Sequence, residues 1–296
     1  MTGLVHHFPD HAAAAERLAA ALGIAARPIA LRTFPDGESL VRVNPAPGTA
    51  LVYCPLDQPD TRLVRLLLAI SALRDGGAER VVLVAPYLGY MRQDVAFNPG
   101  EAVSQRVIGQ LLATACDGLV TVDPHLHRTP SLADVVPGIV AVNVAAAPVI
   151  AEAIAAQVTP ETILVGPDGE SRPWVEAVAR PLGLDMLVGE KVRRGDRQVE
   201  IVQPDAARAA GRPVLLVDDL ISSGGTLREC ARLLAAAGAR IIGATATHCL
   251  ASTDDLAALA AAGIGPVMAT DSVAGPAATI PLAAALAAAI RRAGLL

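Results

Sequence analysis

Short runs of β-branched and leucine residues recur along the chain and alternate with longer stretches whose apolar residues recur every three or four positions. Runs such as RVVLVA at 80–85 and PVLLV at 213–217 contain almost no polar residue, which is typical of strands buried on both faces of a parallel sheet. Stretches such as 60–75 and 104–115 place their apolar residues along one face of a helix. The alternation of the two patterns predicts an α/β protein with parallel sheets.

Strands are expected at 4–8, 28–31, 39–43, 50–54, 80–85, 118–122, 162–165, 185–190, 199–202, 213–219, 241–248 and 266–270. Helices are expected at 11–22, 60–75, 104–115, 147–156, 173–180, 227–237 and 253–262. Because this is too many strands for one compact sheet, we expect two similar doubly wound parallel-sheet domains of the α/β class. The first should cover 1–142, joined by a C-terminal helix at 281–296, and the second 143–280. The segments 80–94 and 213–226 are interpreted as equivalent parts of an ancient duplication.

Composition narrows the class of protein. The 296 residues carry a formal net charge of −5, which argues against a general nucleic-acid binder. The four cysteines are scattered without a CxxC pair, so we expect buried thiols in a reducing cytoplasm rather than a zinc or redox site. The N-terminal segment lacks the features of a signal peptide. Near the C-terminus Arg291 and Arg292 interrupt a short apolar stretch, which favours a packed helix over a membrane span.

The segment 213–226 carries the clearest chemistry. A buried strand ends in two carboxylates, and small polar residues and two glycines follow before the next helix. Such a turn aims backbone N–H groups and a helix N-terminus at an anion. The carboxylates would repel a bare phosphate, so sugar hydroxyls or hydrated Mg²⁺ suit them, and the whole predicts a cradle for ribose 5-phosphate. The residues concerned are Asp218, Asp219, Ser222, Ser223, Gly224, Gly225 and Thr226. The alternative is an ordinary Gly/Ser-rich turn.

Other polar clusters also follow predicted strands. They are FPDGE at 34–38, YMRQD at 90–94, DPH at 123–125, GPDG at 166–169 and EKVRR at 190–194. In open α/β sheets the ligand crevice lies outside the carboxyl ends of the strands. Surface polarity without a function would not respect strand ends, so the clusters predict one large composite site.

The segment 213–226 resembles the phosphoribosyl-diphosphate (PRPP) loop of the phosphoribosyltransferase superfamily. Together with the other five clusters, which occur in the expected order between about 4 and 270, it resembles the ribose-phosphate diphosphokinase (PRPP synthase) family, and in particular its compact archaeal-like branch. The resemblance implies two phosphoribosyltransferase-type domains. It also implies Mg²⁺-dependent transfer of the diphosphoryl group of ATP to the anomeric hydroxyl of ribose 5-phosphate, which gives PRPP and AMP.

The resemblance assigns roles in ATP binding to residues of two clusters: Phe34, Asp36, Glu38, Arg92 and Gln93. In the family the FPDGE-type loop comes from a neighbouring subunit, which implies a homodimer or a higher homo-oligomer. The alternatives are a core aromatic for Phe34 and a solvated charge at a helix end for Arg92.

The resemblance also implies that His125 and Asp168 bind Mg²⁺. It makes Lys191 and Arg193 the catalytic cations, on an arm that we expect to be mobile when empty and to close over polyphosphate. The alternatives are an ordinary histidine, a tight PDG turn and a solvated charge run. His127 and Arg128 are weaker candidates, and Ser222 stands where many family members have an acid.

Two other functions remain open at this point. A non-catalytic homologue could bind nucleotides and regulate a partner, and a phosphoribosyltransferase could consume PRPP. The presence of Lys191, Arg193, Asp218 and Asp219 favours the synthase over the first, and the doubled domain argues against the second.

Overall fold

The structure is a computed structural model that describes residues 3–44, 47–126, 128–194 and 198–296. For 191–194 and 198–200 it describes the backbone but not the side chains. The chain divides into two compact units. Unit 1 comprises the chain up to Ala145 together with Leu282–Leu296, and unit 2 comprises Ala146–Pro281. The last helix therefore packs with the N-terminal half of the chain.

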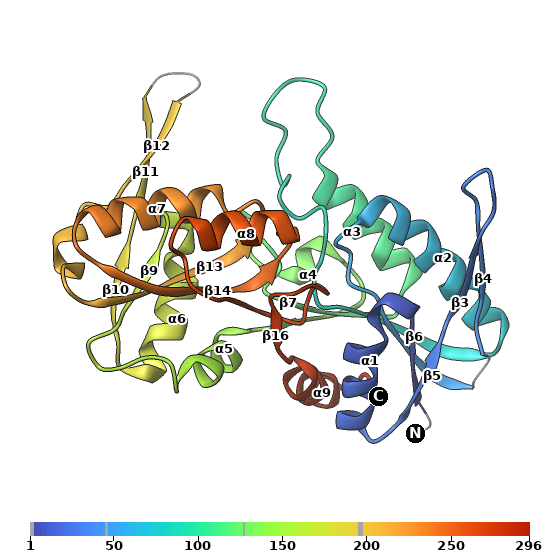
Figure 1. The fold of residues 1–296 in the computed structure, drawn as a ribbon. Helices are drawn as coiled ribbons and strands as arrows, with labels where there is room; N and C mark the ends of the chain where they lie inside the picture. Colours follow the sequence, from blue (N-terminus) through green and yellow to red (C-terminus); the bar gives the residue numbers. More distant parts are fainter. Residues whose placement is uncertain (1–2, 45–46, 127, 195–197) are drawn as a thin grey trace. The chain divides into compact units, whose positions relative to one another are not determined.

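Six parallel strands form the sheet of unit 1, in the order β2-β1-β5-β6-β7-β8 (Figure 1). Their bounds are Gly3–His7 for β1, Ala25–Pro28 for β2, Gly48–Tyr53 for β5, Ala78–Ala85 for β6, Gly118–Val122 for β7 and Val140–Val144 for β8. A separate antiparallel hairpin consists of β3 (Ala30–Thr33) and β4 (Ser39–Arg42). The helices of unit 1 are α1 (Ala12–Leu22), α2 (Pro59–Asp75), α3 (Ser104–Ala115), α4 (Leu132–Val135) and α9 (Ala283–Arg292).

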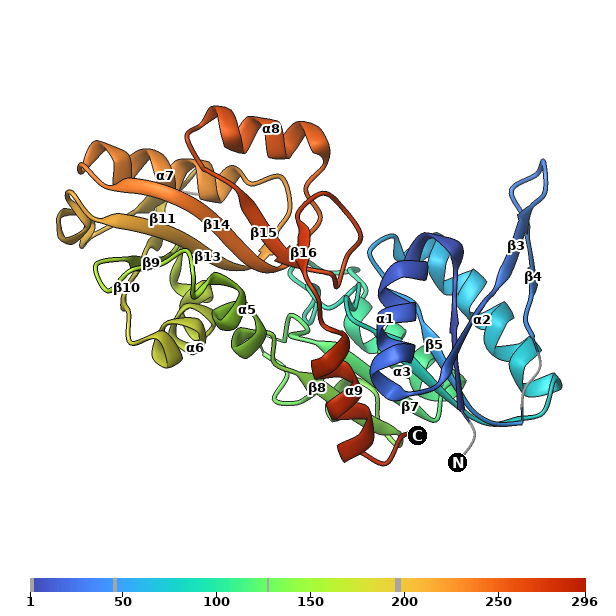
Figure 2. The ribbon, with the colours of Figure 1, turned by 60° about the horizontal axis from the view of Figure 1, so that its bottom comes forward.

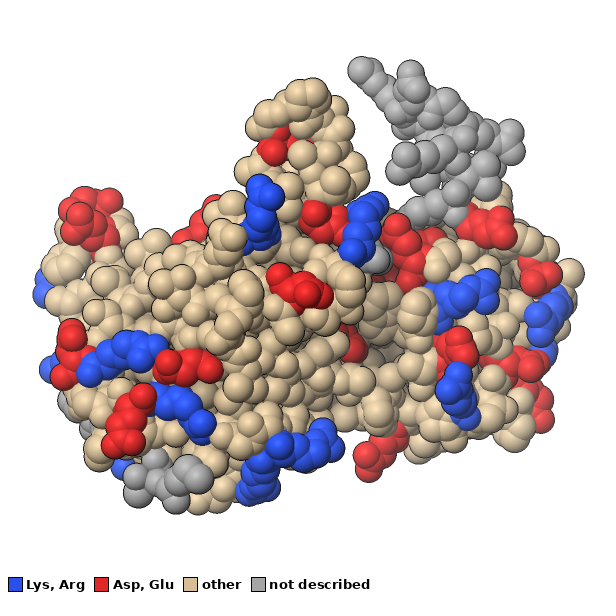
Figure 3. Space-filling view, turned by 180° about the vertical axis from the view of Figure 1, so that it is seen from behind, with Lys and Arg blue, Asp and Glu red and all other residues tan. Residues whose placement is uncertain are grey.

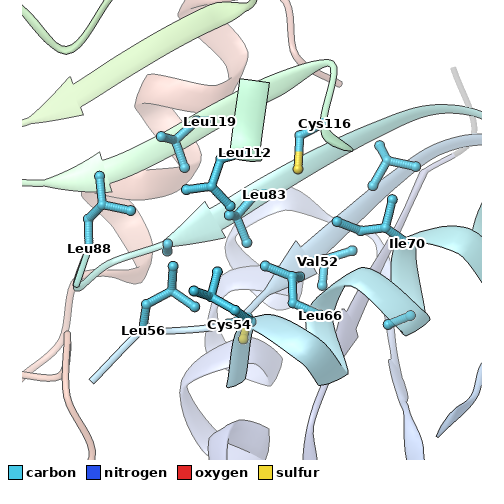
Figure 4. Close-up of a cluster of buried hydrophobic side chains, with 14 of the residues drawn as sticks. Val52, Cys54, Leu56, Leu66, Ile70, Leu83, Leu88, Leu112, Cys116 and Leu119 are labelled. Atoms are coloured by element: carbon cyan, nitrogen blue, oxygen red, sulfur yellow. The ribbon is translucent and has the colours of Figure 1, made fainter. Parts of the chain in front are cut away.

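The core of unit 1 lies between this sheet and its helices. Val52, Leu83 and Leu119 are in register on three neighbouring strands, so their side chains share one face. They form a buried cluster with Leu66 and Ile70 of α2 (Figure 4). The C-terminal helix α9 packs beside α1, where Figure 2 shows the red and blue helices as neighbours. Burial on both faces explains why these strands read as continuous apolar runs.

Unit 2 repeats this plan with six parallel strands in the order β10-β9-β13-β14-β15-β16. Their bounds are Ile163–Gly166 for β9, Asp185–Val188 for β10, Pro213–Ile221 for β13, Arg240–Cys249 for β14, Val267–Thr270 for β15 and Ala278–Ile280 for β16. The antiparallel hairpin here is β11 (Glu190–Arg194) with β12 (Gln198–Val202). The helices are α5 (Ala147–Ile154), α6 (Arg172–Leu182), α7 (Gly225–Ala236) and α8 (Thr253–Ala261).

The two units share one topology. In each, the second sheet strand along the chain takes the edge, the first lies beside it, and the remaining four follow in sequence order. In each, a two-stranded hairpin is inserted between the second and third sheet strands. This confirms the predicted pair of similar doubly wound parallel sheets. The predicted equivalence of 80–94 and 213–226 is wrong by one strand, because the counterpart of β13 is β5 and the counterpart of β6 is β14.

The remaining differences from the predicted elements have simple causes. Strands β8 and β16 are not predicted because both lie at a sheet edge, where β8 is only partly buried and β16 has three residues. The strand predicted at 28–31 is the junction of β2 and β3. The strand predicted to end at Asp219 continues to Ile221.

The surface adds two constraints on function. On the face shown in Figure 3, acidic and basic side chains are interspersed, and the described residues form no extended basic patch there. No helix within the described ranges combines the length and hydrophobicity that a membrane crossing needs.

Candidate active site

The turn between β13 and α7 has the backbone geometry of an anion site. Gly224 adopts a left-handed conformation (φ 72°) at the N-cap of α7, and the helix begins at Gly225. Within the described part of the chain no side chain caps this helix. The N–H groups of its first turn and the positive end of its dipole therefore face the space beyond the turn. An anion placed there would be stabilised by both.

The two glycines of the turn do different things. A Cβ added at Gly224 would lie 2.7 Å from a Leu259 methyl group and would have to keep a positive φ, so the fold needs glycine there. A Cβ added at Gly225 would have Ser223 Oγ as its nearest neighbour, at 3.9 Å, so there is open space above this residue. Ser222 and Ser223 are exposed and Thr226 is half-buried. The predicted hydroxyl donors thus border that space.

Three carboxylates of unit 2 interact electrostatically beside this turn. Burial raises the pKa of Asp218 well above its ordinary value, and the negative charges of Asp219 and Asp168 raise it further. The backbone N–H of Asp219 donates to Asp218 Oδ1 at 3.0 Å. Mutual repulsion of this kind is relieved by a cation or by hydroxyl donors. Both are what the sequence predicts at this end of the ligand.

Asp168 reaches this cluster because β9 and β13 are neighbours. Its Oδ1 accepts a hydrogen bond from the backbone N–H of Glu170 at 3.0 Å, which stabilises the turn after β9. Gly166, the last residue of β9, allows the close approach of the next helix, since a Cβ there would lie 2.1 Å from Ser171 Oγ. The PDG turn is therefore a local structure, as in the alternative reading of the sequence, and it also places its carboxylate beside Asp218.

The cationic arm is the hairpin β11–β12. Lys191 and Arg193 are two positions apart on β11, so they occupy the same face of the strand, while their side chains lie outside the described residues. The hairpin starts next to the Asp168 turn, because the N–H of Gly189 donates to the carbonyl of Gly166 at 2.9 Å. The segment expected to be mobile, 193–198, is paired as strand up to Arg194 and from Gln198, with 195–197 outside the described residues. Its mobility stays a prediction.

In unit 1 the FPDGE cluster forms the tip of the β3–β4 hairpin. The N–H of Phe34 donates to the carbonyl of Glu38 at 2.8 Å, and the N–H of Glu38 donates to Asp36 Oδ1 at 3.1 Å. Phe34 is half-buried and outside the hydrophobic cluster, with the Arg32 guanidinium 5.1 Å from its ring centroid. Phe34 is therefore not a core aromatic. Asp36 and Glu38 are exposed at the tip.

The segment after β6 forms an ordered loop that presents Arg92 to solvent. Gly89 allows its close approach to the β5–α2 connection, since a Cβ there would lie 2.4 Å from the carbonyl oxygen of Leu56. Gln93 donates through Nε2 to Glu101 at 3.4 Å, and its backbone carbonyl accepts from the N–H of Gln105 at 3.2 Å.

Two residues of this loop, Glu101 and Asp94, have interactions that the sequence pattern does not predict. Glu101 accepts hydrogen bonds from the backbone N–H groups of Phe97 and Asn98 at 2.8 and 3.2 Å, which closes the loop on itself. Asp94 has a nearly buried carboxylate that binds Arg128 Nη1 at 2.8 Å. Arg128, a weak candidate from the sequence, thus joins the loop to the DPH segment, whereas the other weak candidate, His127, lies outside the described residues. In the sequence, the signal for Asp94 was its position directly after Arg92 and Gln93.

The DPH segment follows β7. Asp123 has a positive φ of 35°, which is uncommon for a residue with a side chain, and its N–H donates to the carbonyl of Val144 at 3.1 Å. His125 is half-buried in unit 1, whereas Asp168 lies in unit 2. Among the described residues no group of three or more His, Cys, Asp or Glu side chains is arranged to hold a metal ion. The roles of His125 and Asp168 in metal binding stay predictions.

Two doubly wound sheets of one topology, with a glycine turn at a helix N-terminus in the second, define an α/β enzyme of the phosphoribosyltransferase fold type. Residues 5–116 match the family model for the N-terminal domain of ribose phosphate pyrophosphokinase, and residues 143–257 match that for the phosphoribosyl transferase domain. The chain belongs to the ribose-phosphate pyrophosphokinase family, as the resemblance of its motifs implies.

Individual relatives agree over most of the chain. The chain is 38% identical over 263 residues to the ribose-phosphate pyrophosphokinase of Methanopyrus kandleri, which covers 88% of this chain and 89% of the relative. It is 33% identical to ribose-phosphate pyrophosphokinase 2 of Archaeoglobus fulgidus, with coverage of 90% and 92%. The crystal structure of phosphoribosylpyrophosphate synthetase from Mycobacterium smegmatis superposes with a TM-score of 0.80 at 27% identity and covers 98% of both chains.

Proposed function

We propose that this chain transfers the diphosphoryl group of ATP to the anomeric hydroxyl of ribose 5-phosphate. The observation that carries the proposal is the uncapped N-terminus of α7, which lies beside the interacting carboxylates Asp218 and Asp219 in a member of the ribose-phosphate pyrophosphokinase family. One part of this arrangement suits an anion, and the other suits hydroxyl groups or a cation. Ribose 5-phosphate has a phosphate at one end and vicinal hydroxyls at the other.

In this proposal the phosphate of the sugar binds at the open space above Gly225. It accepts hydrogen bonds from the first backbone N–H groups of α7 and from the hydroxyls of Ser222, Ser223 and Thr226. Asp218 and Asp219 accept hydrogen bonds from the ribose hydroxyls. The rise in the pKa of Asp218 in the ligand-free chain follows from burial beside other carboxylates, and hydroxyl donors would favour its charged form again.

The residues present also fit a hard divalent cation. Mg²⁺ prefers carboxylate and water oxygens, and it is bound through one or two carboxylates together with substrate phosphates. Asp168 and His125 are the proposed ligands, with Asp218 as a further carboxylate of the same neighbourhood in unit 2. The ion would neutralise charge on the polyphosphate as the leaving group departs. Full activity in excess chelator would exclude this requirement.

ATP is proposed to bind through Phe34, Asp36 and Glu38 of one subunit and through Arg92 and Gln93 of another. A shared site of this kind requires a homodimer or a larger homo-oligomer. The exposed position of the FPDGE tip, away from the core of its own unit, supports this assignment. The four buried free cysteines support a location in the reducing cytoplasm.

Lys191 and Arg193 are proposed to act on the transferred group. Diphosphoryl transfer needs alignment of the anomeric hydroxyl with the β-phosphorus and neutralisation of developing charge more than it needs covalent chemistry. An arginine offers a planar fork to phosphate oxygens, and a lysine offers a compact charge. A hairpin that starts at the Asp168 turn can bring both cations to the phosphates in one closing motion.

An assay of AMP release from ATP, with and without ribose 5-phosphate, tests the proposal. We expect release that depends on ribose 5-phosphate and on Mg²⁺, with PRPP formed in equal amount. A non-catalytic homologue would bind ATP without releasing AMP. A phosphoribosyltransferase would consume PRPP in the presence of a base and would release no AMP from ATP. Either result would refute the proposal.

A further inference from the structure

Unit 1 has a pocket at the place that corresponds to the Asp168 turn of unit 2. The pocket has a volume of about 200 Å³ and is lined by Phe8, Pro9, Asp10, Leu31, Arg62 and Arg65. It lies at the carboxyl end of β1, where the ligand crevice of an open α/β sheet is expected. Its walls come from the loop after β1, the hairpin strand β3 and the first half of α2.

The internal repeat supports the equivalence of the two places. Strand β1 is the counterpart of β9, and a Pro-Asp pair comes soon after each strand. Phe8-Pro9-Asp10 follow β1, and Pro167-Asp168 follow Gly166, the last residue of β9. In both units a 3-10 turn leads into a helix of 11 residues, and this turn is Pro9–His11 in unit 1 and Gly169–Ser171 in unit 2. Likewise β3–β4 is the counterpart of the β11–β12 hairpin, and α2 is the counterpart of α7. The pocket in unit 1 is therefore built from the same parts of the fold as the Asp168 site.

The unit 1 pocket nevertheless differs from the candidate site of unit 2 in the groups that could bind a ligand. Helix α2 begins at Pro59 and has Asp60 in its first turn, and both features disfavour a phosphate at that helix N-terminus. The glycine turn of α7 has no counterpart here, because the connection reads CPLDQ at 54–58. The charged groups that face the pocket are instead guanidinium side chains from one face of α2.

The two arginines are in different electrostatic situations. Arg62 Nη1 donates to Asp10 Oδ2 at 2.9 Å, and its Nε pairs with Asp57 Oδ1 at 3.1 Å. Arg65 is half-buried and donates to two neutral hydroxyls, Ser39 Oγ at 3.2 Å and Thr33 Oγ1 at 3.4 Å. Among the described residues no carboxylate lies within ion-pair distance of Arg65. A partly buried guanidinium without a carboxylate favours an anionic partner.

Apolar walls and Asp10 narrow the class of anion. Phe8, Pro9 and Leu31 make most of the pocket lining apolar. Such a lining suits a ligand with an apolar body rather than a small hydrated ion. The carboxylate of Asp10 would repel a ligand with two or more negative charges, such as a phosphate ester or a nucleotide. A cavity of ~150 Å³ can hold benzene, so the volume here suits a body of about six carbon atoms.

We propose that this pocket is an effector site of unit 1 for a small monocarboxylate with a compact apolar body. The carboxylate pairs with the guanidinium of Arg65, and the apolar body rests on Phe8 and Leu31. Because Arg65 also binds Thr33 and Ser39, which directly flank the Phe34–Glu38 tip, the ligand alters the position of that tip. This regulatory part rests on the proposed function, in which the tip contacts ATP.

Calorimetric titration of the full chain with isovalerate and with benzoate tests the binding site without any activity measurement. We expect saturable binding of at least one of them, with a Kd of about 1 mM or tighter. Isoamyl alcohol, which has the shape of isovalerate without its charge, should bind at least about tenfold more weakly. Absence of saturable carboxylate binding would overturn the proposal. Inorganic phosphate that competes with the carboxylate would also overturn it, by assigning the pocket to phosphates.

Substitutions separate the charge from the cavity. Arg65→Gln should weaken carboxylate binding at least about tenfold, because a charge-assisted bidentate pair is lost. Leu31→Trp keeps the charge and fills the cavity, so it should weaken binding to a similar extent. The matched control is Arg208→Gln, which removes an arginine from the surface of unit 2 and should leave binding unchanged. Wild-type affinity in either pocket variant, with folding verified by circular dichroism, would contradict the assignment.

Kinetics then test the regulatory part separately. Saturating carboxylate should change the KM for ATP and leave the KM for ribose 5-phosphate within twofold of its original value, since the pocket adjoins only the hairpin assigned to ATP. Binding without any change in the KM for ATP would refute the effector role. An inactive enzyme that still binds carboxylate through Arg65 would refute the proposed function while leaving the binding site intact.

Discussion

The buried imidazole of His6 should make unit 1 sensitive to acid. His6 lies on β1 with no exposed surface, and neither ring nitrogen has a hydrogen-bond partner among the described residues. Burial lowers its pKa from 6.5 to about 4, and the neighbouring His7 and Arg27 contribute to the same effect. Lowering the pKa this far corresponds to about 3 kcal/mol, because one pKa unit is worth about 1.4 kcal/mol.

The sign follows from proton linkage. Between pH 6.5 and pH 4 the unfolded chain binds a proton at His6 and the folded chain does not, so acid favours unfolding. The free energy of unfolding of unit 1 should therefore be unaffected by His6 above pH 7. It should fall by about 3 kcal/mol as the pH decreases through this window, and by no more below pH 4. His6→Val removes the titrating group and should abolish this part of the acid sensitivity.

The variant should also be more stable at neutral pH. A buried polar group without a partner costs about 1–3 kcal/mol, and a neutral imidazole has one donor and one acceptor in that position. Valine has a high β-strand propensity, which adds to the stability of the variant. It is also smaller than histidine, and the cavity that it leaves offsets part of the gain in stability. We expect His6→Val to raise the free energy of unfolding at pH 7 by roughly 1 kcal/mol.

Urea unfolding at a series of pH values measures both effects. Far-UV circular dichroism reports on both units, whereas the fluorescence of the single tryptophan, Trp174 on α6, reports on unit 2. The tryptophan transition thus serves as an internal control and should be the same in wild type and variant. Equal acid sensitivity of the unit 1 transition in the two proteins would refute the reasoning, because it would show that His6 is solvated or partnered.

Three further predictions concern the proposed catalytic function. Gly225→Val should leave the fold intact, since the nearest atom to the new Cβ is 3.9 Å away, but raise the KM for ribose 5-phosphate more than about tenfold; an unchanged KM would remove the phosphate assignment. Lys191→Ala and Arg193→Ala should each lower kcat and kcat/KM together by about 10²–10³ with nearly normal ATP binding, and an effect on ATP binding alone would make them ground-state ligands. Mixing the inactive variants Phe34→Ala and Arg92→Ala should restore activity through shared sites, and no recovery after proven subunit exchange would count against a site between subunits.

The fold class follows from the sequence because buried parallel strands have a strong local signature. The runs at 80–85 and 118–122 contain one polar residue each, since helices cover both faces of the sheet, and the structure has strands there. The helix at 104–115 is predicted to the residue. Edge strands such as β8 have no such signature, because one side lacks a neighbouring strand and only part of each strand is buried.

The composition of the candidate site was also available in the sequence. Strand ends and glycine turns mark 166–169 and 218–226 because a parallel sheet brings its ligands to one edge. The sequence does not show that the charge of Asp168 raises the pKa of Asp218, because this effect depends on β9 lying beside β13 and hence on strand order. The ties of Asp94 to Arg128 and of Glu101 to its loop also join chain segments that no periodicity connects.

The sequence by itself determined the class of fold, the family and the residue types at each strand end, because these depend on local periodicity and on short motifs. Only the tertiary structure decided that the two hairpins are counterparts and that β13 corresponds to β5 rather than β6. It also decided that Arg65 lacks a carboxylate while Arg62, three residues before it on the same helix, has two. Such differences arise from long-range packing, which sets the dielectric surroundings and the partners of each charge.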